Sequence, residues 1–158
     1  MIEAENDKRN SGDNVAARQR MMALCAGASV ADLDAALVAL GPLPAVVDLR
    51  LPDVGLVMVQ GRAGGDGAPF NVGEATVARA AVQVADGPTG FAWHLGRDVA
   101  KARLAAIIDA LWQDEARRAG VEAALAPVDE RLAADAAARA AQTAATRVDF
   151  FTMVRGED

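Results

Sequence analysis

The chain has 158 residues, which suits a single domain with a core of its own. Apolar residues make up 53% of it, and alanine is the commonest of them, with four Phe, two Trp and no Tyr, so we expect a core of small side chains. The net charge is −6 and the basic residues are scattered, which argues against nucleic acid as a partner because phosphate binding relies on clustered Lys and Arg.

Cysteine use and hydropathy indicate the compartment. Cys25 is the only cysteine, so no intrachain disulfide can form; we expect a buried structural thiol and a reducing environment. No apolar run approaches the ~18 residues that span a membrane. Residues 1–14 are polar and lack the apolar stretch of a secretory signal. We therefore expect a cytoplasmic protein without membrane insertion.

The N-terminal third predicts a polar arm and two helices. Residues 1–14 offer almost no apolar surface and are expected to be a disordered arm, so that residues 15–158 form the single domain. Residues 15–27 have a helical pattern. Ser29 and Asp32 resemble a capping box, and Gly41 with Pro42 ends the helix that follows.

The middle of the chain is rich in β-branched residues. Residues 45–51 and 55–62 predict a hairpin around Pro52-Asp53-Val54, and residues 61–67 predict a turn. The pattern of residues 75–84 fits helix or strand, and we choose strand. In residues 91–95, Phe91, Trp93 and Leu95 share one face of a strand, and His94 lies on the other. We expect a surface or hydrogen-bonded histidine.

The C-terminal third predicts two helices and a tail. Asp98 caps a helix that Gly120 interrupts, and Pro127 suits the first turn of a second helix, about residues 128–146. The second helix is mostly alanine, so it must pack at close range or lean on a partner. Together these elements predict an α+β fold: N-terminal helices, a mainly antiparallel sheet in the middle, two C-terminal helices and an extended C-terminal tail.

The tail, residues 147–158, holds two of the four Phe residues. As a strand it would carry bulk on both faces, so we expect it to dock on a partner chain or on a second copy. The candidate interface is Val148, Phe150, Phe151, Met153 and Val154. The alternative is that the tail forms a strand of the protein's own sheet.

The motifs of catalysis are missing from this sequence. One His and one Cys cannot form a four-ligand metal site, and no Gly-x-Ser-x-Gly occurs. The Gly-rich turn at residues 61–67 lacks the Gly-Lys-Ser/Thr ending of a phosphate-binding loop. We interpret it as a plain turn. The alternative is a backbone nest that contacts an anion, with Arg62 and Arg79 as weak candidate contacts. We assign no catalytic, cofactor or metal residue.

Several runs in this sequence resemble the PhnG family, a small subunit of the bacterial carbon–phosphorus lyase core complex. They are residues 55–62, 64–67 with Phe70, 73–82, 96–98, 108–111 and 147–156. The resemblance spans about residues 15–158 in order, and the tail is its most specific part. The polar arm before Val15 departs from the family, and His94 falls where no fixed residue is expected.

The resemblance implies phosphonate catabolism under phosphate starvation. The family's partners are PhnH, PhnI and PhnJ, with an ATP-binding-cassette-type subunit. PhnG, PhnH and PhnI, together with the ATP-binding-cassette-type subunit, displace adenine from MgATP by a phosphonate, giving ribose 1-methylphosphonate 5-triphosphate from methylphosphonate, and PhnJ later breaks the carbon–phosphorus bond. This implies an accessory subunit of a transferase that is not catalytic alone and binds no cofactor, MgATP being a substrate of the complex. Self-association of the isolated chain stays open.

Two other hypotheses remain beside this one. The first is a stand-alone anion- or nucleotide-binding module that uses the turn at residues 61–67. The second is a regulatory binding protein, for which the sequence offers no dedicated sensor site.

Overall fold

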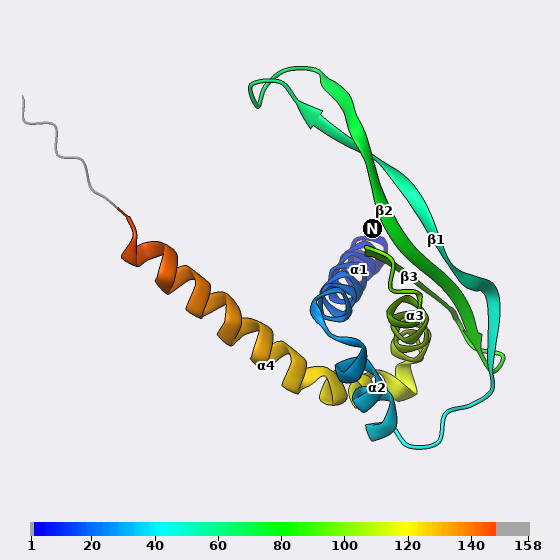
Figure 1. Cartoon of the computed structure of the whole chain (residues 1–158). Coiled ribbons are helices and arrows are strands. Elements are labelled where there is room, and N and C mark those ends of the chain that lie inside the picture. Colours follow the sequence, from blue (N-terminus) through cyan, green and yellow to red (C-terminus); the bar gives the residue numbers. More distant parts are fainter. Residues whose placement is uncertain (1, 148–158) are drawn as a thin grey trace, which may run out of the picture.

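The structure, a computed structural model, describes residues 2–147, with side chains from Gly12 onward. In chain order the elements are α1 (Ile2–Gly27), α2 (Val30–Ala39), β1 (Val46–Arg62), β2 (Pro69–Val84), β3 (Thr89–Leu95), α3 (Val99–Gln113) and α4 (Glu115–Ala145). The strands form one antiparallel sheet in the order β1-β2-β3 (Figure 1). The predicted α+β class, with N-terminal helices, a central antiparallel sheet and two C-terminal helices, is confirmed.

Helix α3 packs on one face of the sheet, and the other three helices pack around α3 on that same side (Figure 1). The layer between α3 and the sheet consists mostly of alanine. Gly90 shows why. A Cβ added there would lie 1.9 Å from the backbone oxygen of Ala106 and 2.5 Å from the backbone nitrogen of Ala110. At Gly90 the helix therefore lies so close to the sheet that no side chain fits between them.

One buried carboxylate ties three elements together. Asp109, on α3, is 1% exposed and accepts hydrogen bonds from Nε and Nη2 of Arg18 at 2.8 and 2.7 Å. It also accepts from the backbone N–H of Phe91 at 2.8 Å and from Gln113 Nε2 at 3.2 Å. Asp109 thus joins α1 and β3 to α3, and the paired carboxylate raises the pKa of the Arg18 guanidinium.

The structure continues helix α1 back to Ile2, across the segment expected to be a disordered arm. The segment contains Glu, Ala, Lys and Arg, which are good helix formers. Because adding residues to an existing helix costs far less than starting one, the packed turns after Val15 can support its extension. The boundary expected at Val15 therefore does not coincide with an end of α1.

The predicted hairpin around Pro52 is wrong. Residues 46–62 form one long strand, and the partner of β1 is β2, joined by the turn between Arg62 and Pro69. The register shifts between Asp48 and Arg50 and again before Asp53, so the strand accommodates Pro52 in an irregular stretch at the sheet edge. The strand chosen for residues 75–84 is confirmed as part of β2.

The break between the C-terminal helices lies at Asp114, and not near Gly120 or Pro127 as predicted. Asp114 ends α3 and caps α4 by accepting from the backbone N–H of Ala116 at 3.0 Å. Helix α4 then continues through both Gly120 and Pro127. Val121, Leu125 and Val128 are buried on either side of Pro127, and their packing outweighs the hydrogen bond that proline removes.

Candidate subunit interface

Strand β3 alternates as predicted, but its larger side chains face outward. Phe91, Trp93 and Leu95 are 47%, 53% and 81% exposed, whereas His94 is only 6% exposed. The expectation of a surface or hydrogen-bonded histidine is wrong, because His94 is buried and neither ring nitrogen has a hydrogen-bond partner within the described residues. The close approach of α3 leaves the inner face to Gly90, Ala92 and His94.

Exposed apolar side chains concentrate on the sheet. Among the described residues, twelve of the sixteen large apolar residues that are exposed lie on its three strands. They are Val47, Leu49, Leu51, Val54, Leu56, Met58, Val59, Phe70, Val72, Phe91, Trp93 and Leu95. Many exposed apolar side chains on one sheet favour protein–protein contact sites there.

Part of this surface lies on a projecting hairpin arm, which we define as residues 56–76. Strand β3 ends where Leu95 pairs with Val77, so beyond that point β1 and β2 form a two-stranded ribbon without a third strand. The ribbon extends away from the helices (Figure 1). A two-stranded ribbon is marginally stable alone, so its apolar side chains favour contact with another chain.

A polar row crosses the uncovered face of the sheet. The Arg79 guanidinium carbon lies 5.5 Å from the centroid of the Trp93 ring, and Arg79 donates to Asp53 at 2.8 and 3.2 Å. Arg50 Nη2 donates to the same carboxylate at 3.0 Å. A Cβ added at Gly55 would lie 2.9 Å from the guanidinium carbon of Arg79, so the glycine leaves room for that side chain.

These ion pairs fix the charge of the row. The hydrogen bonds from Arg79, and then those from Arg50, hold the pKa of the Asp53 carboxyl well below its usual range. The row therefore carries two guanidinium charges and one carboxylate charge beside an indole ring. Trp and Arg are the residue types that contribute most to binding at protein interfaces.

The structure does not bring the two candidate anion contacts together. Arg79 is engaged by Asp53 near the base of the sheet, whereas Arg62 pairs with Pro69 at the tip of the hairpin arm. The nine residue-to-residue steps from Asp53 to Arg62 along β1 correspond to about 30 Å. Arg62 donates to the backbone oxygen of Gly67 across the turn, at 3.2 Å. An anion contact at either arginine stays a prediction.

The predicted tail interface of Val148, Phe150, Phe151, Met153 and Val154 lies outside the described residues. The helix before it is described. After Leu132, which packs against Gly27, every residue of α4 is exposed. Residues 133–145 therefore extend about 20 Å beyond the last packed turn (Figure 1). We call this segment the α4 arm.

A groove of about 560 Å³ lies between α1, α3 and α4. Small and apolar side chains line most of it, among them Ala17 and Leu24, and its charged members are Arg20, Glu122 and Asp129. Glu122 accepts a hydrogen bond from the indole nitrogen of Trp112 at 3.0 Å. Such a groove can receive side chains of a neighbouring chain, and none of the groups in it forms a nucleophile–base pair.

Within the described residues, no three His, Cys, Asp or Glu side chains gather to hold a metal ion. None of the described helices is long and apolar enough to cross a membrane. Sequence reasoning missed the exposed apolar surface of the sheet, because its residues lie far apart in the chain. Trp93 and Arg79 could both be seen in the sequence, but they become neighbours only through strand pairing.

Two comparisons with known proteins show related sequences. A family profile described as "Phosphonate metabolism protein PhnG" matches residues 16–156. The chain is also similar to a protein of Rhizobium meliloti (strain 1021) described as "Alpha-D-ribose 1-methylphosphonate 5-triphosphate synthase subunit PhnG". The two are 51% identical over 158 residues, which cover 100% of both chains.

Proposed function

The chain belongs to the PhnG family, and from this premise we propose that it is the PhnG subunit of an α-D-ribose 1-methylphosphonate 5-triphosphate synthase that acts in phosphonate catabolism. The full-length match to a protein with that description carries the proposal. A subunit needs surfaces for its neighbours, and the exposed apolar residues of the sheet and of the hairpin arm supply them.

The subunit's role in this proposal is accessory. It assembles with PhnI, PhnH and PhnJ, and with an ATP-binding-cassette-type subunit through the complex, in the cytoplasm. The complex displaces adenine from MgATP by a phosphonate, and this chain contributes no catalytic residue or cofactor to that reaction. In support, the described part of the chain exposes many large apolar side chains, which suit contacts with other subunits.

The uncovered face of the sheet is the contact surface that we propose for a partner subunit. Phe91 and Trp93 stand beside Arg79 on this face, and their side chains are half exposed, so their removal should leave the core intact. Truncation of such anchors at an interface costs roughly 2 kcal/mol or more each, which is about 30-fold in affinity.

The test replaces Phe91 and Trp93 with Ser and measures co-purification with co-expressed PhnI and PhnH. The expected result is a folded chain, by circular dichroism and melting temperature, that no longer co-purifies. Val38→Ser is the control, because Val38 is also an exposed apolar residue but lies on α2, away from the sheet. A double variant that folds and still assembles like the control would overturn the sheet face as the contact surface.

The accessory role has its own test. The purified chain is incubated with MgATP and methylphosphonate, alone and together with PhnH, PhnI and the ATP-binding-cassette-type subunit. We expect adenine release coupled to phosphonate transfer only in the full mixture. Turnover by the isolated chain, or its saturable binding of ATP or phosphonate at micromolar concentration, would favour the stand-alone module instead.

A further inference from the structure

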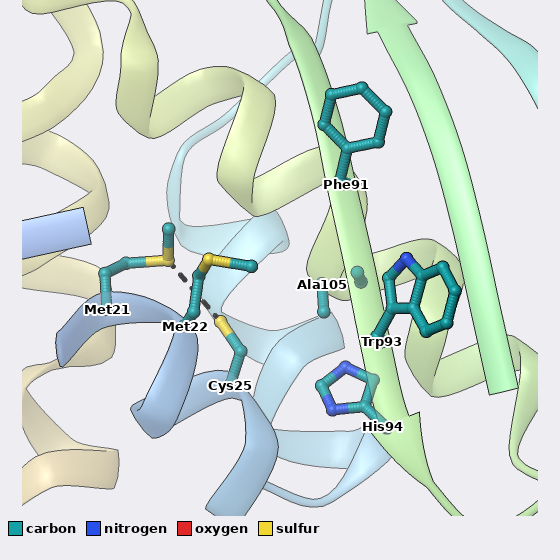
Figure 2. A pocket seen from close by; sticks show the side chains of 8 residues that line it. Met21, Met22, Cys25, Phe91, Trp93, His94 and Ala105 are labelled. Atoms are coloured by element: carbon teal, nitrogen blue, oxygen red, sulfur yellow. Dashed lines mark hydrogen bonds between the residues drawn. The ribbon is translucent and has the colours of Figure 1, made fainter. Parts of the chain in front are cut away.

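Four side chains with sulfur or imidazole donors meet at a small cavity between α1 and β3. Met21, Met22 and Cys25 come from one turn of α1, and His94 comes from β3. Figure 2 shows the three sulfur-bearing side chains on the α1 side and the imidazole between Cys25 and the β3 backbone. The cavity has a volume of about 30 Å³, which is room for one water-sized occupant.

His94 is the observation that points to a ligand. It is 94% buried, it lines the cavity, and neither ring nitrogen has a hydrogen-bond partner among the described residues. Buried polar groups in native proteins are nearly always paired, because a donor or acceptor without a partner costs free energy. An imidazole in this position is therefore set to bind something that enters the cavity.

The sulfur atoms are spaced as two ligands of one ion would be. Cys25 Sγ lies 3.7 Å from Met21 Sδ. Two metal–sulfur bonds of about 2.3 Å that end on atoms this far apart enclose an angle of about 110°, near the tetrahedral value. Met22, one residue along the helix, lines the same cavity.

We propose that Met21, Met22, Cys25 and His94 form a binding site for a soft monovalent cation, copper(I). Thioether and thiolate sulfur select Cu(I), whereas zinc sites are built from Cys, His and carboxylates without methionine. As the ion binds, the Cys25 thiol loses its proton to solvent and the sulfur–copper bond replaces the sulfur–hydrogen bond. No electron is transferred.

Charge also favours a monovalent ion. One thiolate and one Cu(I) sum to zero, so the bound site is neutral inside an apolar environment. A divalent ion would leave one positive charge buried without a partner, which is costly.

This proposal differs from the sequence-based expectation that the subunit holds no metal. That expectation counted ligands for a four-coordinate zinc site and left methionine out. Sequence alone places Met21, Met22 and Cys25 on one helix, but only the fold brings His94 to them. Met21 and Cys25 belong to a hydrophobic core that consists mostly of other residues, so we expect the protein to fold without the ion.

The test uses the reduced full-length chain under anaerobic conditions. Cu(I) is supplied as its coloured complex with a competing chelator, and the colour fades as the protein takes the ion. We expect one Cu(I) per chain to leave the chelator, with a new thiolate-to-copper absorption band. Cys25→Ala and His94→Leu should each bind at least about 100-fold more weakly, because even residues that only orient a metal ligand cost 10–100-fold. Met58→Leu, which changes an exposed methionine on the hairpin arm, should bind like the wild type.

Two results would overturn the site. One is a wild-type chain that takes no Cu(I) from the chelator. The other is equal binding by the wild type and Cys25→Ala, which would place the copper elsewhere. Circular dichroism checks that each variant folds. Should Cys25→Ala fail to fold, Met22→Leu preserves side-chain volume and must weaken binding relative to Met58→Leu for the site to stand.

Discussion

Removal of the Asp109 carboxylate is expected to destabilise the protein more than any other single change of a charged side chain described above. Asp109 lies on α3 and accepts four hydrogen bonds, two from Arg18 on α1, one from the backbone of Phe91 on β3 and one from Gln113. Asp109→Ala breaks all of them at once. It leaves a guanidinium and a backbone N–H without their acceptor, at the junction of three elements.

The loss of stability in Asp109→Ala can be worked out from the buried groups that lose their acceptor. Removing one partner of a buried ion pair costs about 3–5 kcal/mol, and an unsatisfied buried donor costs about 1–3 kcal/mol. The Arg18 side chain is 33% exposed, so water can recover part of its loss. We therefore expect about 3–5 kcal/mol in total. For a chain of this length, 1 kcal/mol shifts Tm by about 2–4 °C, which predicts a fall of about 6–20 °C.

Chemical and thermal denaturation followed by circular dichroism measure the change. Asp135→Ala is the matched control, because Asp135 forms an exposed ion pair with Arg131 on α4, and such pairs contribute less than about 1 kcal/mol. The double variant Arg18→Met with Asp109→Leu should recover much of the loss, since apolar replacement of both partners removes the uncompensated charge. A loss below about 1 kcal/mol in Asp109→Ala would refute this reasoning.

Three further changes test the close packing and the caps. Burial, together with Lys101, holds the pKa of His94 below its ordinary value of 6.5, so the unfolded chain binds a proton that the folded chain resists. The contribution of neutral His94 to stability is therefore complete above pH 6.5 and falls as the pH drops toward the pKa of the folded state. His94→Leu should flatten the dependence of Tm on pH in that window. An unchanged dependence of Tm on pH would contradict the role given to His94. Gly90→Ala places a Cβ 1.9 Å from a backbone oxygen of α3 and should cost at least about 3 kcal/mol in denaturant unfolding, whereas Gly73→Ala meets nothing within 4 Å and should be neutral or slightly stabilising. Ser29→Ala removes the capping box of α2 and should lower stability by about 1 kcal/mol; a change within error would mean that the cap is replaced by solvent.

The sequence predicted most of the elements, because their local signals agreed with their final environment. The capping box at Ser29 is present as expected, and the alternation in residues 91–95 is that of a strand. Sequence reasoning failed where Gly or Pro was taken as the end of an element and tertiary packing continued the element instead. Pro52 was taken for a turn, but an edge strand with irregular register tolerates it. Gly120 and Pro127 were taken for helix ends, although Asp114 was the cap.

The interface was harder to predict than the fold. Arg79 was identified from the sequence as a weak candidate anion contact, but its partners depend on strand pairing: Asp53 lies opposite it on β1 and Trp93 opposite it on β3. Because Asp53 was assigned to a turn, the ion pair could not be anticipated. His94 was placed on the correct strand, yet which face the helices cover depends on how closely α3 approaches Gly90.

The distribution of side-chain size argues that this fold is completed by other chains. The sheet keeps Gly90 and Ala92 inside and Phe91 and Trp93 outside, which is the reverse of what a monomer needs. The close approach of α3 explains the small residues on the inner face of the sheet. It does not explain why the outer face carries large apolar residues. The hairpin arm and the α4 arm also leave the body in different directions, and the uncovered sheet face lies opposite the helices (Figure 1). One compact neighbour cannot cover all three surfaces, so we expect the subunit to contact at least two chains.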